Sequence, residues 1–392
     1  MAASGQSTIR KVYAHVALQS FAENSGGLFV NAFLVRQGVP VPLALASFAL
    51  LLLSRFALRG AVLPLAKRMG LRNVLALGVA VRTVGYLLLP SVTGIGPMLG
   101  FYLFVSGLGS VLYWTSYHAF VSAVGDSAAR GRQVSIQQAA TAIVAIVAPI
   151  TGGLLLVSAG PRIGFVVVAL VQAAAALPLL TAPNPAVVRD VAPAAPSAVV
   201  LTRFARRLYF AEGLHAGCAG VVWNMALFVS LGERFEAFGG AMALAGLVAA
   251  AGSLLIGRLI DSGEGRRTLV LAYGAAALAI AIKALAFASP MAAVGATALG
   301  ALVTPMAATA LLSPLYGMAQ RSACVLRFAM ATEGGWDLGC AGACLIAAAA
   351  LQLGAGFRLP ILLGLAAVSA ITLMLRHWYA QAAAQPGLAE PA

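Results

Sequence analysis

Long apolar runs, separated by short basic or Pro/Gly-rich stretches, fill the whole sequence. An α-helix needs about 20 such residues to cross the hydrocarbon core of a bilayer. The runs predict a first set of helices near residues 12–36, 41–66, 72–90, 96–124, 133–157 and 162–182. They predict a second set near residues 207–232, 238–260, 268–288, 290–318, 326–353 and 357–376. The pattern therefore indicates an all-α integral membrane protein with twelve transmembrane helices.

One long interior connection separates the two sets of helices. Residues 183–204 contain four prolines among small and polar residues, a composition typical of a linker. We therefore expect an N-terminal six-helix bundle over residues 1–182, a cytoplasmic linker over 183–204, and a C-terminal six-helix bundle with a short cytoplasmic tail over 205–392.

Weak internal repeats support a duplicated unit, as in many transporters. The tripeptide Phe-Ala-Glu occurs at residues 21–23 and again at 210–212, in the first predicted helix of each half. The basic turn at residues 65–72 is echoed at 259–267, and Arg132 is echoed by Arg327. These similar spacings make an ancestral duplication plausible without proving it.

Composition and charge agree with a membrane location. Hydrophobic residues make up 61% of the chain and charged residues 9%, against about 25% charged in soluble domains. The net charge of +14 comes from bases concentrated on alternate inter-helix segments and the termini, while the intervening segments carry only Arg36, Arg162, Arg234 and Arg358. This asymmetry predicts a multi-pass protein of the cytoplasmic membrane with both termini in the cytoplasm, in contact with anionic lipids rather than nucleic acid.

The sequence contains none of the common catalytic or metal-binding motifs. It contains no P-loop, nucleophile elbow, H-E-x-x-H or C-x-x-C pattern, so neither an ATP-driven pump nor an enzyme is indicated. Cys340 and Cys344 share a helix face among Ala and Gly and are interpreted as packing residues. We expect no cofactor, no metal site and no disulfide framework.

Two local motifs carry chemistry. Between the eighth and ninth predicted helices stands GRLIDSGEGRR, in which a glycine turn presents an acid and two bases; its key residues are Gly257, Asp261, Gly265, Arg266 and Arg267. The fifth helix contains APITGG, in which Pro149, Gly152 and Gly153 permit a kink and close backbone packing.

These motifs and the six-plus-six arrangement resemble the major facilitator superfamily across essentially the whole chain. The 257–267 segment is similar to that family's cytoplasmic G-x-x-x-D-x-x-G-R-R gating loop. The first-half copy has Lys67 where the acid would stand, although Arg68, Gly70 and Arg72 remain. The APITGG element looks like the G-P-x-x-G-G element of drug/proton antiporters, which tilts the expected direction toward export; an ordinary packing kink is the alternative.

Eight ionisable side chains lie inside predicted helices, where each is unfavourable by roughly 2.5 to 3.5 kcal/mol. The acids are Glu23, Glu212, Glu333 and Asp337, and the bases are Arg55, Arg59, Arg82 and Lys283. Four acids against four bases favour mutual pairing. Helix rise places Glu23, Arg82 and Asp337 closest to the bilayer midplane, the depth of substrate and coupling-ion sites in transporters.

Proton coupling is assigned to Glu23, Glu333 and Asp337. Glu333 and Asp337 are four residues apart on one helix face, and two close carboxylates in a low dielectric do not both ionise easily. The alternative is structural pairing: Glu23 with Arg82, Glu333 with Arg327, and Asp337 with Arg55 or Arg82.

Polar and aromatic residues of three helices are the substrate-binding candidates. By the resemblance, helices 1, 4, 7 and 10 line the central cavity. The candidates on the first, fourth and seventh helices are Asn24, Asn31, Tyr113, Trp114, Tyr117, His118, Trp223 and Asn224. An interfacial aromatic belt and packing amides are the alternative interpretation.

The sequence thus predicts a monomeric secondary transporter that moves a small organic solute by alternating access. Coupling to protons is expected, with export slightly favoured. A non-transporting facilitator-fold protein that acts in assembly or lipid handling is the main alternative, and an integral-membrane enzyme is a distant third.

Overall fold

The computed structural model describes residues 2–124, 130–185, 196–260 and 265–384. Within these residues every regular element is a helix. Ten helical segments among them are long and apolar enough to cross a membrane, and α14 adds the shorter apolar stretches Pro290–Thr304 and Ala310–Ala319. The chain is therefore a multi-pass, all-helical membrane protein.

The first half of the sequence forms α1 to α9, several of them joined end to end by short 3-10 turns. These elements are α1 (Ala2–Ser25), η1 (Gly27–Phe29), α2 (Val30–Arg36), α3 (Val41–Leu58), η2 (Arg59–Ala61), α4 (Val62–Met69), α5 (Leu71–Leu88), η3 (Leu89–Ser91), α6 (Pro97–Val124), α7 (Arg130–Ser158), α8 (Gly160–Ala174) and α9 (Leu177–Leu180).

The second half forms the remaining helices and contains one π-helical turn. These elements are α10 (Pro196–Ala216), the π-helical turn η4 (Gly217–Val222), α11 (Trp223–Ser230), α12 (Phe235–Ile260), α13 (Gly265–Ala286), α14 (Pro290–Gln320), α15 (Val325–Gln352) and α16 (Arg358–Ala384).

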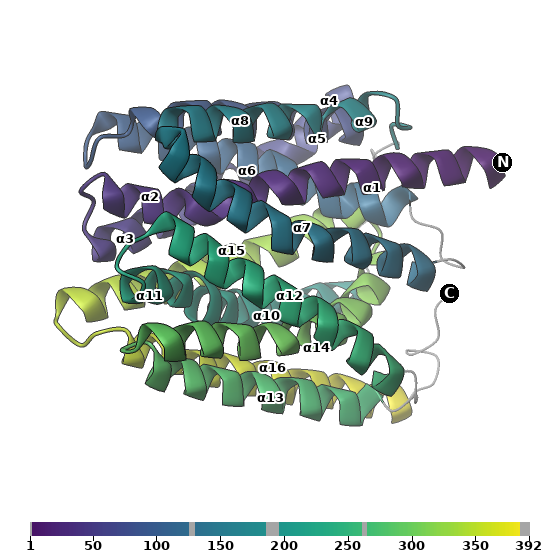
Figure 1. Ribbon diagram of the computed structural model, residues 1–392. Coiled ribbons are helices and arrows are strands. Elements are labelled where there is room, and N and C mark those ends of the chain that lie inside the picture. Colours follow the sequence, from purple (N-terminus) through teal and green to yellow (C-terminus); the bar gives the residue numbers. More distant parts are fainter. Residues whose placement is uncertain (1, 125–129, 186–195, 261–264, 385–392) are drawn as a thin grey trace.

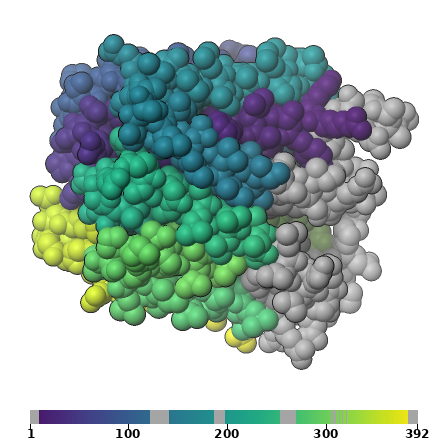
Figure 2. Space-filling model, viewed as in Figure 1, coloured from purple at the N-terminus to yellow at the C-terminus, as the bar shows by residue number. Residues whose placement is uncertain are grey.

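The helices lie side by side along one common direction (Figure 1). In that view the helices of the first half occupy the upper part and most of the second half lies below, with the N and C labels at the same end. The two halves meet where α7 packs on α12 and where α3 packs on α15. The space-filling view shows the same division, with purple and blue above green and yellow (Figure 2).

Several helix ends differ from the sequence prediction. Residues 196–204 were expected in the linker, but α10 already begins at Pro196, because proline fits the first position of a helix. The extra turns are held by packing, since Phe204 stacks on Trp378 with 5.5 Å between ring centroids. The last helix likewise runs past residue 376 to Ala384.

The first-half copy of the basic loop is fastened to its own half. Gly70 has a φ of +85°, and the loop turns there between α4 and α5. The Arg72 guanidinium donates to the carbonyl of Ala182 at 2.8 Å, and the Arg72 backbone N–H donates to Asn184 at 3.0 Å. These bonds join the loop to the end of the sixth predicted helix rather than to the second half.

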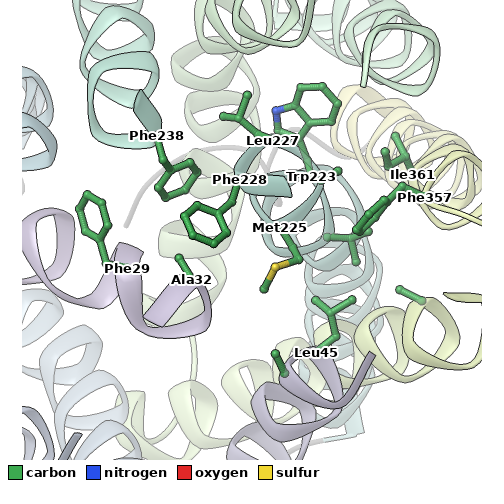
Figure 3. Packing of buried hydrophobic residues seen from close by; sticks show 14 of the residues in the cluster. Phe29, Ala32, Leu45, Trp223, Met225, Leu227, Phe228, Phe238, Phe357 and Ile361 are labelled. Carbon is green, nitrogen blue, oxygen red and sulfur yellow. The ribbon is translucent and has the colours of Figure 1, made fainter. Parts of the chain in front are cut away.

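A buried apolar core joins the two halves near the end opposite the chain termini. Its centre is the aromatic cluster, which we define as Phe29, Phe228, Phe235 and Phe238. Figure 3 shows Phe29 of η1 beside Phe228 of α11 and Phe238 of α12. Ring centroids lie 5.6 Å apart for Phe29–Phe238 and 5.7 Å for Phe228–Phe238, both edge to face.

The fifth predicted helix packs tightly at its glycines. α7 continues unbroken through Pro149. A Cβ on Gly153 would lie 2.7 Å from the carbonyl oxygen of Phe235, and one on Gly239 of α12 would collide with the carbonyl oxygen of Pro149. The backbones of α7 and α12 therefore approach each other without intervening side chains, as small residues allow in membrane helices.

Candidate functional site

A group of five ionisable side chains bridges the two halves; we call it the interhalf charge cluster. It consists of Arg55 of α3, Arg59 of η2, His118 of α6, and Glu333 and Asp337 of α15. The first three come from the first half of the chain and the two acids from the second. The cluster therefore depends on how the halves are placed relative to each other.

Asp337 is the centre of the cluster. Its side chain is completely buried, and its two oxygens face two different arginines. Arg55 Nε lies 2.6 Å from Oδ1, and Arg59 Nη2 contacts Oδ2. One carboxylate thus holds two guanidinium groups, so its removal would leave at least one buried positive charge without a counter-charge.

Glu333 lies one turn from Asp337 and has a different environment. Arg55 Nη2 donates to its Oε2 at 2.9 Å, and His118 Nε2 lies 3.5 Å from its Oε1. The Glu333 side chain is 8% exposed and that of His118 is 24% exposed. Glu333 therefore has one arginine and one titratable, partly exposed neighbour, where Asp337 has two arginines.

Neutral groups complete the cluster. Ser110 accepts from Arg55 and Thr115 accepts from Arg59, each at 3.3 Å. The Trp336 ring lies under the Arg55 guanidinium at 5.4 Å, within cation–π range. Two arginines balance two carboxylates when both acids are ionised, so a single added proton gives the cluster a net positive charge.

Glu23 forms a second ion pair, within the first half. Its carboxylate contacts Arg82 of α5, as the structural interpretation of the sequence expected. Gln19 donates to Glu23 at 3.2 Å, and the Arg82 guanidinium lies 5.3 Å from the Tyr113 ring centroid. The Glu23 side chain is 30% exposed, the most accessible of the three proposed coupling acids.

The aromatic candidates of α6 divide into two groups. Tyr113 and Tyr117 stack on each other and are buried in a core formed mostly by the first half. His15 fixes Tyr113 by a defined geometry: its Nδ1 donates to the Ala175 carbonyl at 2.7 Å, which leaves Nε2, 3.2 Å from the Tyr113 hydroxyl, as acceptor in the neutral ring. Trp114 stacks on His118 and is only half-buried.

The candidates in the second half surround the π-helical turn. Trp223 follows the turn and donates to Thr297 of α14 at 3.0 Å. Lys283 of α13 donates to the carbonyl of Ala219 inside the turn at 2.9 Å, and its ammonium lies 5.3 Å from the Trp223 ring centroid. Trp223 and Lys283 thus join α14 and α13 to the η4–α11 segment.

The three asparagine candidates lie on α1, α2 and α11. Asn24 donates to the carbonyl of Ser20 in its own helix at 2.8 Å. Asn31 and Asn224 are half-buried on α2 and α11. Asp261 lies outside the described residues, as do the side chains at Arg266 and Arg267, so the predicted gating loop stays a prediction.

One expected pairing is wrong, and four interior polar residues were not singled out from the sequence. Glu333 pairs with Arg55 and His118, not with Arg327, because α3 lies against α15 and brings Arg55 to the same depth. Sequence reasoning also passed over His15, Gln19, Gln172 and His215 as interior polar groups. The signal was present, since each is a polar residue inside an apolar run.

Comparisons with known proteins agree with this architecture. A family model described as the Major Facilitator Superfamily matches residues 40–323. A variant of the E. coli fucose:proton symporter FucP shares the fold with a TM-score of 0.64 and 14% identity, covering 94% of this chain and 98% of that chain. A second structure, described as the transporter FucP in the outward conformation, gives a TM-score of 0.63 with the same identity and coverage. No curated protein sequence matches the chain.

Proposed function

Because the chain belongs to the major facilitator superfamily, whose members are transporters and not enzymes, we propose that it carries a small organic solute across the cytoplasmic membrane by alternating access. Twelve membrane passes form two six-helix bundles, residues 1–182 and 205–392, with both termini in the cytoplasm. Membrane lipids surround a monomer, and no cofactor takes part. The proposed direction is export, on the strength of the helix-5 element around Pro149.

One observation carries the proposal: the interhalf charge cluster joins α3 and α6 of the first half to α15 of the second. Alternating access requires contacts that exist in one arrangement of the bundles and are broken in another. The cluster is such a contact. Its charges balance only while Arg55 and Arg59 face Glu333 and Asp337.

Proton binding at the cluster would change this balance. Of its two acids, Glu333 is the better exchange group, because His118 and not a second arginine lies beside it. A proton on Glu333 removes one of the two carboxylate charges that face Arg55 and weakens the attraction between α3 and α15. Asp337 then acts as the anchor, and proton uptake and bundle separation become linked.

Glu23 is the second proposed exchange group. It is the most exposed of the three acids but is held by Arg82 within one half, so a proton there changes charge without changing an interhalf contact. The structural likeness to a protein titled a fucose:proton symporter adds support for proton coupling in this fold.

A non-transporting role in assembly or lipid handling is the second candidate. The observation in its favour is that all eight membrane charges have a partner in the structure, including Lys283 on a backbone carbonyl. Such balance suits a rigid scaffold as well as a resting transporter. Transport measurements separate the two.

Proteoliposomes with an imposed pH gradient test the proposal. The panel contains sugars including fucose, amino acids, organic anions and hydrophobic amines, and an enclosed pH-sensitive dye reports proton movement. We expect one class to accumulate with proton flux in the wild type. Glu333→Gln should abolish gradient-driven accumulation yet keep counterflow, because the neutral side chain still permits binding and reorientation.

The matched control is Glu236→Gln, at an acid that pairs with Arg234 at the surface end of α12. It should transport like the wild type. Full gradient-driven accumulation by Glu333→Gln would contradict the assigned role. The absence of counterflow with every class in the wild type would favour the non-transporting candidate.

A further inference from the structure

Glu212 and His215 of α10 form a pair outside the two ion-paired groups described above. They lie one turn apart on the same helix, with Glu212 Oε2 3.6 Å from His215 Nδ1. That distance is too long for a hydrogen bond, and His215 Nδ1 is buried with no hydrogen-bond partner among the described residues. The side chains keep 24% and 18% exposure. The two side chains are therefore close together, are not joined by a hydrogen bond, and are partly exposed.

Among the described residues, no arginine or lysine of the surrounding helices forms an ion pair with Glu212. Tyr273 of α13 interacts electrostatically with Glu212 and with Tyr379 of α16. The two tyrosines are neutral phenols. The sequence of α14 contains no acid and no base. α15 presents glycines to α10, and its two acids are held by the arginines of the interhalf charge cluster.

The remaining bases near α10 are engaged elsewhere or face away. The Lys283 ammonium donates to Ala219, seven residues along from Glu212. The Arg206 side chain packs against Gly335 of α15. Other bases of α10, α15 and α16 are exposed: Arg203, Arg207, Arg327, Arg376 and His377. Among the described side chains, only His215 forms an ion pair with Glu212.

The first half shows the contrast. Glu23 and Glu212 are the last residues of the two Phe-Ala-Glu tripeptides. Glu23 pairs with Arg82, a base that stays charged. Glu212 is met by a histidine, whose charge depends on a proton. With neutral His215, an ionised Glu212 would be a single negative charge in a membrane helix, which is unfavourable. One shared proton makes the pair neutral.

We propose that Glu212 and His215 together bind one exchangeable proton, and that this proton controls the π-helical turn that follows them. The turn begins at Gly217, two residues beyond His215, and Lys283 holds its Ala219 carbonyl. When the proton leaves, a negative charge appears about 10 Å along the helix from that carbonyl, by helix rise. Lys283 is drawn toward this charge and releases the turn. Single π-helical turns inside helices are frequent at functional sites.

The test uses infrared pH-difference spectra of the full-length protein in lipid nanodiscs, without any solute. Wild type should show a protonated-carboxyl band that titrates; Glu212→Gln should lose that band and His215→Asn should shift its midpoint. Glu236→Gln is the control and should keep the band. A Glu212→Gln spectrum identical to the wild type overturns the proposal. If the Gln variant does not fold, Glu212→Asp replaces it, and an unshifted midpoint there overturns the proposal equally.

Hydrogen exchange of the amides at 217–222 tests the second step. Their exchange, corrected for its intrinsic pH dependence, should speed up several-fold on deprotonation in the wild type and lose that response in Glu212→Gln. Lys283→Met should be fast throughout, and a wild-type response in that variant would overturn the role of Lys283. Because no solute is needed, these outcomes are independent of whether the interhalf charge cluster couples transport.

Discussion

Asp337 is the most constrained charged residue of the interior. Two arginines from consecutive elements of one helix converge on a side chain with no exposed surface. A buried ion pair contributes little net stability compared with apolar packing, yet losing one partner is costly because it leaves a desolvated charge. Asp337 is therefore a point where stability and conformational change depend on the same contact.

Asp337→Asn should lower the free energy of unfolding by about 3 to 5 kcal/mol, because Arg59 is then left without a counter-charge. The double variant Asp337→Asn with Arg59→Met should recover part of that loss, since it removes both partners. Thermal unfolding in detergent of the two single variants and the double variant forms a double-mutant cycle. A double variant less stable than either single variant would show that the pair does not act as a unit.

The residue pairings show what a single sequence can and cannot supply. Depth along the helices was enough to suggest Glu23 with Arg82, and the structure confirms that pair. Arg55 was one of the two bases suggested for Asp337, and the structure confirms that pair. Arg55 was not suggested for Glu333, from which it is 278 positions away. For Glu333, the sequence suggested Arg327 of the same helix as a partner. The observed partner, Arg55, belongs to the first half of the chain.

At the scale of elements, α7 and α12 are held by backbone contact at glycines. Two adjacent glycines of α12 have opposite surroundings. A Cβ on Gly239 would meet the Pro149 carbonyl and lie 3.3 Å from the Phe29 ring, whereas one on Gly240 would have nothing within 4 Å. The interface thus depends on one of the two positions.

Gly239→Ala should force α7 and α12 apart, lowering the thermal stability and the transport rate. Gly240→Ala should leave both unchanged or raise stability by up to about 1 kcal/mol, because alanine favours helix over glycine. The two variants have the same composition and differ by one position, so each is the control for the other. Equal stability of the two would mean that the close α7–α12 approach is not required.

The existence of the helices was easier to predict than their internal breaks. The length of each apolar run was enough to predict a helix. The 3-10 turn at Arg59–Ala61 and the π-helical turn at Gly217–Val222 both lie inside such runs, the first at a charged residue and the second among glycines and apolar residues. These breaks follow from tertiary contacts, such as Arg59 reaching Asp337 and Lys283 reaching Ala219. Sequence periodicity contains no signal for such contacts.

For the whole molecule, two of the contacts that join the halves differ in their chemistry. The aromatic cluster lies toward the end away from the chain termini, and the interhalf charge cluster lies between α3, α6 and α15. Aromatic packing is insensitive to protons, while the charge cluster responds to them. In the mechanism that we propose, protonation at the charge cluster is followed by separation of the aromatic cluster.

Locking the aromatic cluster should then stop transport. In a background without the four native cysteines, we would replace Phe29 and Phe238, whose ring centroids lie 5.6 Å apart across the halves, with cysteine and join them by a short bismaleimide. The matched control joins Phe33 and Phe165, which lie 5.2 Å apart within the first half. Both pairs are edge-to-face phenylalanine contacts, so replacing either pair with cysteines removes similar packing before any cross-link forms.

Before the reagent is added, both double-cysteine variants should retain counterflow of whichever solute class the wild type carries. After cross-linking, the Phe29/Phe238 variant should lose nearly all of its counterflow, because the bundles can no longer separate at that end, while the Phe33/Phe165 variant should be unaffected.

Mass spectrometry of the cross-linked peptides gives the fraction of protein that is cross-linked, against which the remaining activity is plotted. Activity that falls in proportion to the interhalf cross-link would identify this end as one that opens during each cycle. Activity that persists in fully joined protein would mean that solute passes without separation of the aromatic cluster, and the alternating-access proposal would have to be abandoned for this end.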